Sequence, residues 1–223
     1  MVKKCEAIVS VCPPHAAVDV AEMVISAGFK GIYLDANAIA PRTTQHIGGL
    51  MAKNGIEFVD GGIVGGPPTK AGTTWLYLSG PQAAQAATWF SGGLLAPEIL
   101  NDQIGAASGL KMCFAASTKG YNALLTAIMG AAEELGVRHA LENQWDRYWP
   151  EFSEQKKSSA VSVAYNKAWR FAGEMDEMAK TWEDVGVPND FFIGAAEVYR
   201  RIGHLRESAE EQSIEEVLKE VKK

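Results

Sequence analysis

Two lysines in an apolar stretch are the residues best suited to chemistry. Lys111 and Lys119 lie in a proline-free stretch, residues 106–135, that is rich in Ala, Leu, Met and Lys and predicts a long helix. A hydroxyl group that is oxidised must lose a proton. A lysine that is partly desolvated by an apolar pocket has a lowered pKa and can exchange that proton. Either lysine is therefore a candidate for proton transfer, although the usual place of a lysine on an amphipathic helix is the solvent-exposed face.

The sequence spacing of the two lysines gives the angle between them round the predicted helix. Lys119 follows Lys111 by eight residues, which places it about 80° further round the helix. Lys119 is therefore either a rival for the proton-transfer role or a group that binds a substrate carboxylate. Asn122, three residues later, is a candidate to orient a substrate hydroxyl, and a solvent-facing polar residue is an equally good interpretation.

The sequence lacks the residue patterns of several other common kinds of catalytic and binding site. The three cysteines, Cys5, Cys12 and Cys113, form no CxxC pair, so we expect no disulfide framework, no metal site and a reducing, cytoplasmic location. The sequence has no GxSxG motif, and the glycine-rich residues 61–72 lack the GxxxxGK[ST] order of a phosphate loop. The four histidines offer no catalytic pair.

Composition narrows the choice of partners. The chain has 223 residues, of which 47% are hydrophobic, so it can bury a substantial core. Its net charge of −6 provides no basic surface for nucleic acid. The apolar run at residues 7–12 is far shorter than the roughly 20 residues of a membrane-spanning helix. We therefore expect a small-molecule substrate, no nucleic acid and no membrane.

The predicted secondary structure that must position the two lysines changes along the chain, from alternating strands and helices to helices alone. Strands are predicted at residues 7–12, 31–35, 57–61 and 75–79, and helices at residues 18–27, 41–53 and 81–90. This alternation predicts a largely parallel sheet with helices on its faces. Helices alone are predicted afterwards, at residues 106–135, 158–185, 190–206 and 213–221. The sequence therefore predicts an α/β domain (residues 1–104) and an all-helical domain (residues 105–223).

Three short segments resemble one dehydrogenase superfamily in their order and spacing. They are Cys12-Pro13-Pro14, Asp35-Ala36-Asn37-Ala38-Ile39-Ala40-Pro41 and Phe58-Val59-Asp60-Gly61-Gly62-Ile63-Val64-Gly65-Gly66. Together they resemble segments of the β-hydroxyacid and 6-phosphogluconate dehydrogenases, which include 3-hydroxyisobutyrate dehydrogenase. The resemblance covers essentially the whole chain. Residues 110–120 and 167–175 also resemble a little-characterised branch of the superfamily, known mainly as a domain of unknown function.

The resemblance implies a fold, a cofactor and a set of site residues. The implied fold is the C-terminal half of a Rossmann domain, a doubly wound parallel sheet, followed by a helical dimerisation and substrate domain with a long interdomain helix. The implied cofactor is NADP or NAD, and the implied assembly is a homodimer. The implied cofactor-binding residues are Cys12, Pro13, Pro14 and Asn37. The implied substrate-binding residues are Gly62, Val64, Gly65, Gly66 and Asn122.

The resemblance also distinguishes between the two lysines. In the superfamily the catalytic lysine follows a glycine by six positions at the start of the long helix, and Gly105 and Lys111 have this spacing. Lys111 is therefore the preferred proton-transfer group, and Lys119 is the alternative.

Three positions depart from the pattern of the superfamily. Ala115 stands where an asparagine is expected, Val64 where a serine is expected, and Glu174 where a lysine is expected. These changes remove groups that handle a small hydroxyacid. They favour a bulkier or less anionic substrate.

The sequence lacks the GxGxxG motif with which a Rossmann domain binds pyrophosphate at a helix N-terminus. The resemblance aligns the first strand with the family's fourth strand, so roughly 60–70 further residues are expected ahead of it, at about thirty residues per βαβ unit.

The leading hypothesis is an NAD(P)-dependent oxidoreductase that transfers hydride between the nicotinamide and a small hydroxy or keto acid. The alternatives are an imine-reducing enzyme and a truncated, non-catalytic dimerising remnant. Titration with NADPH separates these classes, because only a cofactor-competent enzyme should quench tryptophan fluorescence.

Overall fold

The computed structural model describes residues 4–208 and 212–222. The chain divides into two compact units. We call Met1–Phe114 with Lys180–Val187 the α/β unit, and Ala115–Ala179 with Pro188–Lys223 the helical unit. The last strand ends at Asn101 and the next helix begins at Ala106, whereas the compact units divide after Phe114.

The α/β unit is built around a five-stranded sheet of order β1-β2-β3-β4-β5. Neighbouring strands are parallel except for the antiparallel pair β3 and β4. The predicted class, a largely parallel α/β sheet followed by helices, is confirmed. In chain order the elements are β1 (Ala7–Ser10), a 3₁₀ turn (Pro14–Ala16), α1 (Ala17–Ser26), β2 (Ile32–Asp35), α2 (Pro41–Lys53), β3 (Glu57–Gly65), β4 (Thr74–Ser79), α3 (Ala83–Thr88), β5 (Ala96–Asn101) and α4 (Ala106–Ala115).

Three details of the strands differ from the predictions. β3 continues to Gly65 instead of ending at residue 61, so most of the segment expected to form a substrate loop is strand. The chain then turns back through residues 66–73, where glycine and proline favour a turn, and β4 runs antiparallel to β3. β5 was not predicted, because its sequence APEILN contains a proline and lacks a clear alternation, as edge strands often do.

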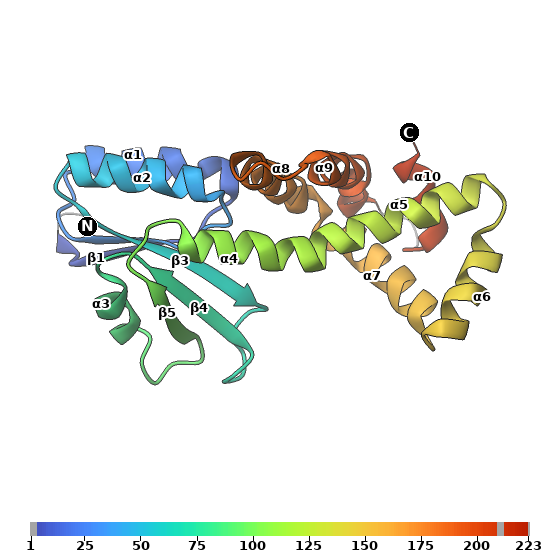
Figure 1. Ribbon diagram of the computed structural model, residues 1–223, viewed down its shortest axis with the longest axis horizontal. Helices are drawn as coiled ribbons and strands as arrows, with labels where there is room; N and C mark the ends of the chain where they lie inside the picture. Colours follow the sequence, from blue (N-terminus) through green and yellow to red (C-terminus); the bar gives the residue numbers. More distant parts are fainter. Residues whose placement is uncertain (1–3, 209–211, 223) are drawn as a thin grey trace. The chain divides into compact units, whose positions relative to one another are not determined.

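α1 and α2 cover one face of the sheet, and α3 lies on the other (Figure 1). On the first face the rings of Tyr33 and Phe58 stack at 6.2 Å. Ala21 of α1 and Met51 of α2 pack into the same cluster. The second face carries a separate apolar cluster with α3, made of Ile32, Leu34, Ala36, Val59, Leu76, Leu78, Ala83 and Ala86. α2 begins at Pro41 as predicted, because the fixed φ of proline suits the first turn of a helix.

The helical unit begins within the long predicted helix. Residues 106–134 are helical as predicted, but a π-helical segment, Ala116–Gly120, separates α4 from α5. We call it the π segment; such segments occur often at functional sites. The remaining elements are α5 (Tyr121–Glu134), α6 (Arg138–Tyr148), α7 (Phe152–Asn166), α8 (Ala168–Asp184, whose last turn belongs to the α/β unit), α9 (Asp190–Ile202), a 3₁₀ segment (Gly203–Glu207) and α10 (Ile214–Val221).

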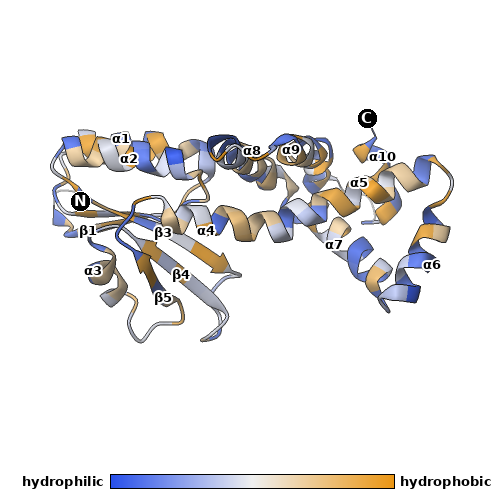
Figure 2. Ribbon diagram, in the orientation of Figure 1, coloured by the Kyte–Doolittle hydropathy of each residue, from blue (hydrophilic) through white to orange (hydrophobic). Residues whose placement is uncertain are grey.

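Other helix predictions need correction. The predicted helix at residues 158–185 is two helices, α7 and α8, which are separated by Lys167 with a non-helical φ of −135°. α6 was not predicted, because it is largely hydrophilic and lacks a clear apolar period (Figure 2). The apolar stripe of the last helix is confirmed: Val217, Leu218 and Val221 are buried. No helix in the described part of the chain is long and apolar enough to cross a membrane.

Candidate active site

Four buried polar side chains form a row across the sheet of the α/β unit. Ser10, Asp35, Asp60 and Ser79 are successive register neighbours on β1, β2, β3 and β4. Each exposes 5% or less of its surface. The row lies at the carboxyl ends of the parallel strands β1 and β2, the edge at which open α/β sheets bind their ligands.

Asn37 ties the loops after β1 and β2 together at this edge. Its Oδ1 accepts a hydrogen bond from the Cys12 N–H at 2.6 Å. Its Nδ2 donates to Ser10 Oγ at 3.1 Å and to Asp35 Oδ2 at 3.0 Å, and its N–H donates to Asp35 Oδ1 at 3.0 Å. The side-chain amide of Asn37 therefore uses both of its polar atoms within the protein, and its geometry is that of a brace for the Cys12 loop.

In the loop after β1, Val11 is 67% exposed and Cys12 is half-buried. Burial raises the pKa of the Cys12 thiol, which keeps it protonated at neutral pH. Pro13 is exposed and extended, and Pro14 begins the 3₁₀ turn. The structure thus joins Asn37 to the loop that contains Cys12, Pro13 and Pro14, and cofactor binding by these residues stays a prediction.

Burial is also the largest influence on the pKa of the two carboxyl groups in the row. It raises the pKa of Asp35 to about 6, against the opposing effect of the hydrogen bonds from Asn37, and the charge of Asp60 adds to the rise. Burial raises the pKa of Asp60 as well, and hydrogen bonds from Ser108, Ser79 and Gly105 oppose it.

Lys111 lies against β3. Its Nζ donates a hydrogen bond to the backbone oxygen of Ile63. A Cβ atom on Gly62 would lie 2.7 Å from the oxygen of Ala107 and 3.2 Å from Lys111 Cβ, so only a glycine lets α4 pack this closely. The structure therefore brings two predicted residues, Gly62 and Lys111, into contact.

The other residues of the implied substrate segment have different surroundings. Val64 is only 6% exposed within β3. Gly65 has a φ of 117°, and a Cβ atom there would lie 2.5 Å from the oxygen of Thr73, so this glycine closes the β3–β4 hairpin. Gly66 is exposed, and a Cβ atom there would meet nothing within 4 Å. Of these three residues, Gly66 has the most open surroundings.

Lys119 forms a buried cluster within the helical unit. Its ammonium group makes an ion pair with Glu174 of α8 and lies 4.7 Å from the centre of the Phe171 ring. The Tyr199 hydroxyl of α9 donates a hydrogen bond to the backbone oxygen of Lys119 at 2.6 Å. Burial and the charge of Glu174 raise the pKa of Tyr199, so its hydroxyl remains a donor. Glu174, one of the residues that departs from the superfamily, is thus the partner of Lys119.

Asn122 lies on the first turn of α5. Its Nδ2 donates a hydrogen bond to Ser159 Oγ of α7 at 2.6 Å. Its Oδ1 is buried and accepts no hydrogen bond from the residues that the structure describes. A buried acceptor of this kind costs stability unless a further donor reaches it, so Asn122 remains a candidate to bind a substrate hydroxyl.

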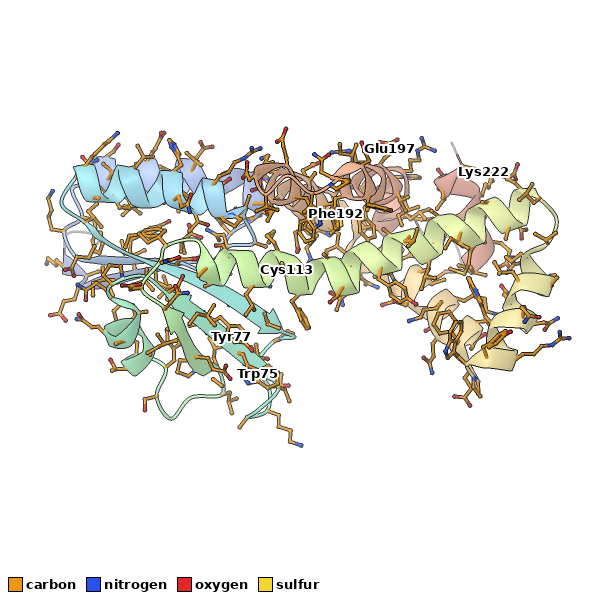
Figure 3. All side chains as sticks on the ribbon, in the orientation of Figure 1. Trp75, Tyr77, Cys113, Phe192, Glu197 and Lys222 are labelled. Atoms are coloured by element: carbon orange, nitrogen blue, oxygen red, sulfur yellow. The ribbon has the colours of Figure 1, made fainter. Side chains whose placement is uncertain are left out.

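A pocket of about 460 Å³ lies between α5 and α9 of the helical unit. Ala116 and Gly120 of the π segment form part of its wall, and Phe192 of α9, labelled in Figure 3, contacts Gly120. The other lining residues are mostly apolar, with Asp190 as a charged residue. Pockets of this volume and lining accept small organic molecules or side chains of a partner.

The structure reveals two groups of residues that the sequence analysis missed. One is the polar row, whose members stand at or near the ends of apolar strands; that position was a usable signal for Ser10 and Asp35. The other is the set of Phe171, Glu174 and Tyr199 around Lys119, which no local pattern connects. Within residues 4–208 and 212–222, no group of three or more His, Cys, Asp or Glu side chains is placed to hold a metal ion.

The fold is the one found in 3-hydroxyacid dehydrogenases, including 3-hydroxyisobutyrate dehydrogenases. A conserved protein of unknown function, described as structurally similar to 3-hydroxyacid dehydrogenases, superposes with a TM-score of 0.65 at 26% identity over 91% of this chain and 77% of its own. A conserved hypothetical protein of Sinorhizobium meliloti gives a TM-score of 0.72 at 21% identity over 99% of this chain and 75% of its own. An imine reductase of Myxococcus stipitatus, solved with NADP⁺, gives a TM-score of 0.51 at 15% identity over 100% of this chain and 82% of its own.

Two comparisons concern the sequence itself. Residues 132–202 match the model of a family described as a domain of unknown function, DUF1932. An uncharacterized 28.5 kDa protein of Methanothermus fervidus, encoded in the 7S RNA 5′ region, is 31% identical over 137 residues, which are 61% of this chain and 52% of that protein. The chain thus spans about half the length of this curated relative.

Proposed function

We propose that the chain forms part of an NAD(P)-dependent oxidoreductase that transfers hydride between the nicotinamide and a small hydroxy or keto compound. In this proposal Lys111 exchanges the proton of the substrate oxygen. The observation that carries the proposal is the position of Lys111, which lies over Gly62 and is held by the backbone oxygen of Ile63. Two further points support the proposal: the Gly105-to-Lys111 spacing resembles that of the superfamily's catalytic lysine, and the fold is that of 3-hydroxyacid dehydrogenases.

The residues of the α/β unit fit the nicotinamide end of such a cofactor. The loops after β1 and β2 lie at the carboxyl edge of the parallel strands and are braced by Asn37, whose own polar atoms are used within the protein. The loop of Cys12, Pro13 and Pro14 would therefore contact the nicotinamide end mainly through its surface, because the Cys12 N–H already donates to Asn37 and proline has no N–H. The bound cofactor would supply or accept the hydride. None of the residues in this chain is assigned to the pyrophosphate, because the GxGxxG motif is absent from the sequence.

Lys111 would hold and move the proton. Proton transfer requires Nζ to lie within hydrogen-bond distance of the substrate oxygen, so a fixed position of Nζ favours the reaction. The hydrogen bond to Ile63 O supplies such a fixed position. The lysine is half-buried, and this limits competition from water. Lys119 is the alternative group, but its ammonium already has an anionic partner in Glu174.

The test is a measurement of hydride transfer. The chain would be joined to a related N-terminal segment that carries GxGxxG, and NADPH absorbance would be followed with a panel of hydroxy, keto and imine compounds. We expect turnover of at least one compound class that depends on Lys111. Absence of turnover in a fusion that folds and binds NADPH would contradict the proposal and favour a non-catalytic dimerising protein.

One observation favours a second candidate, the reduction of a neutral carbonyl or imine. Glu174 stands where the superfamily pattern has a lysine, and it neutralises Lys119. The helical unit therefore carries less positive charge around Lys119 than the superfamily pattern would give, which is unfavourable for an anionic ligand. Comparison of kcat/KM for matched substrates with and without a carboxylate separates the two candidates: an imine or neutral ketone should be preferred if the second is right.

A further inference from the structure

Asp60 connects strand β3 to the start of α4. Its Oδ2 accepts hydrogen bonds from the Gly105 N–H at 2.9 Å, from the Ser108 N–H at 3.1 Å and from Ser79 Oγ at 2.9 Å. Its Oδ1 accepts a hydrogen bond from Ser108 Oγ at 2.6 Å. Asp60 is completely buried, so these donors replace water around its carboxyl group.

These contacts satisfy the first backbone N–H groups of α4, which cannot find partners inside the helix. Asp60 accepts from Gly105 and Ser108, and Ser79 Oγ accepts from the Ala107 N–H at 3.1 Å. A carboxylate at this end also interacts favourably with the helix dipole. The cap therefore comes from β3 and β4 instead of from the residue that precedes the helix.

The backbone at Gly105 fixes where the helix begins. Gly105 has a φ of 106°, which side-chain-bearing residues rarely adopt, and a Cβ atom there would lie 3.0 Å from Gln45 Nε2. Its oxygen accepts the first helical hydrogen bond, from the Gly109 N–H at 2.9 Å. The six-residue spacing from Gly105 to Lys111 is thus the distance from the start of the helix to its lysine.

The same strand that caps the helix also holds the lysine. Gly62 follows Asp60 by two residues and therefore lies on the same face of β3. It leaves room for Lys111, and the next residue, Ile63, accepts the hydrogen bond from Lys111 Nζ. Lys111 follows the capped residue Ser108 by three positions, less than one helical turn. β3 thus fixes α4 at its start and again at the lysine.

We propose that Asp60 is a positioning residue for Lys111: as a buried anionic cap carried by β3, it sets the register of α4 and so the place of the lysine Nζ. The inference rests on the function proposed for Lys111, and it adds a residue that acts through that lysine without touching substrate. The competing explanation is that Asp60 only contributes to the stability of the unit, as any well-bonded buried carboxyl group does.

The chain offers a matched control in Asp35. It is the register neighbour of Asp60 on β2 and is 1% exposed, against 0% for Asp60. Its side-chain hydrogen bonds come from Asn37 in the loop after β2, not from α4. Asp35→Asn therefore changes an equally buried carboxyl group one strand away and leaves the cap of α4 intact.

The experiment measures the reactivity of individual lysines in the full chain. Native protein is labelled briefly with trace acetic anhydride, and the acetylation rate of each lysine is obtained by peptide mass spectrometry. In Asp60→Asn we expect Lys111 to react roughly tenfold faster, because the loss of charge-assisted hydrogen bonds opens the start of the helix. Lys119, in the helical unit, is the internal reference and should keep its rate.

The outcomes separate positioning from stability. Faster labelling of Lys111 alone in Asp60→Asn, with wild-type rates in Asp35→Asn, supports the proposal. Equal rates in wild type and Asp60→Asn overturn it, and so does a similar rise in Asp35→Asn or a parallel rise at Lys119. If Asp60→Asn does not fold, Ser108→Ala removes the hydroxyl that donates to Asp60 Oδ1 and that also bonds Thr44 Oγ1 at 2.8 Å. This variant is expected to give a smaller rise at Lys111 alone; an unchanged rate in it overturns the proposal.

The result is independent of turnover. If the labelling supports Asp60 as a positioning residue while Lys111→Ala leaves hydride transfer intact, the proposed function is wrong and the structural role stands. In an active fusion, Asp60→Asn should lower kcat and leave cofactor affinity unchanged, whereas a purely structural residue should lower only the amount of folded enzyme.

Discussion

The carboxylate of Glu174 lies against the ammonium group of Lys119 and ties α8 to the π segment of the helical unit. The side chains of Glu174 and Lys119 are 8% and 22% exposed, so both charges are largely removed from water. A lysine at position 174, as in the superfamily pattern, would place two positive charges together here. With glutamate at position 174, the two side chains instead attract each other and their charges cancel.

The first prediction concerns this pair. Lys119→Met leaves the Glu174 charge buried without its partner, and we expect it to lower the free energy of unfolding by roughly 3 kcal/mol. The double variant Lys119→Met/Glu174→Leu removes both charges and should lose clearly less. Urea unfolding of the wild type and the variants measures both values. If the double variant were as unstable as Lys119→Met, the unpaired Glu174 charge would not be the cause of the lost stability.

The second prediction concerns catalysis by the fused enzyme. Lys111→Ala should lower kcat by roughly 10²–10⁴-fold with cofactor affinity nearly unchanged, because a proton-transfer group acts in the transition state. Lys111→Arg should not restore activity, since a guanidinium group stays protonated. If Lys119→Ala abolishes turnover while Lys111→Ala only raises KM, the roles of the two lysines are exchanged. If neither variant matters, the lysine mechanism is wrong.

The third prediction concerns pH. The pKa of Asp35 rises from 3.8 to about 6 on folding, mainly through burial. Its contribution to stability is therefore complete below pH 4 and is lost as the pH rises through 6, about 3 kcal/mol in all. Asp35→Asn should remove this dependence. The difference in unfolding free energy between pH 5 and pH 8 should change by about 1 kcal/mol relative to wild type. Parallel pH profiles of the two proteins would exclude Asp35 as the cause.

The fourth prediction concerns assembly. Tyr121, Leu124, Ile128 and Leu135 are spaced at helical intervals along α5 and its C-cap, and they are 43%, 50%, 36% and 75% exposed. Such a stripe is typical of a surface that a second chain covers. We expect a homodimer, and Leu124→Glu should weaken it. Ile99→Glu, at a site 52% exposed on β5, is the control and should stay dimeric. Light scattering that returns 24.0 kDa for the wild type at micromolar concentration would count against the dimer.

The fifth prediction concerns the cofactor. The chain by itself should bind NAD(P)H with millimolar affinity at best, because its sequence has no GxGxxG motif and the contacts that we propose are confined to the nicotinamide end. Calorimetry with NADPH measures this affinity. Micromolar binding would mean that other residues of the chain hold the pyrophosphate.

Much of the fold could be predicted from local patterns. The run Ala7–Ser10, the proline at the start of α2 and the apolar period of α10 each appear in a short window of sequence. The spacing from Gly105 to Lys111 is also local, and its physical basis is the positive φ of Gly105 at the start of α4. Residues of this kind are predictable because the hydrogen bonds and steric limits that specify them act between near neighbours.

The sequence by itself determined that an α/β part precedes a helical part, the candidate lysines and the segments that carry the resemblance. Only the tertiary structure decided that β3 runs on to Gly65 against β4, that Asp60 caps a helix 45 residues later, and that Glu174 neutralises Lys119. The physical reason is the separation in sequence of the residues that make contact. Strand pairing, a cap borne on another element and a buried ion pair are set by contacts between distant residues, and their energies depend on burial that no local window of sequence contains.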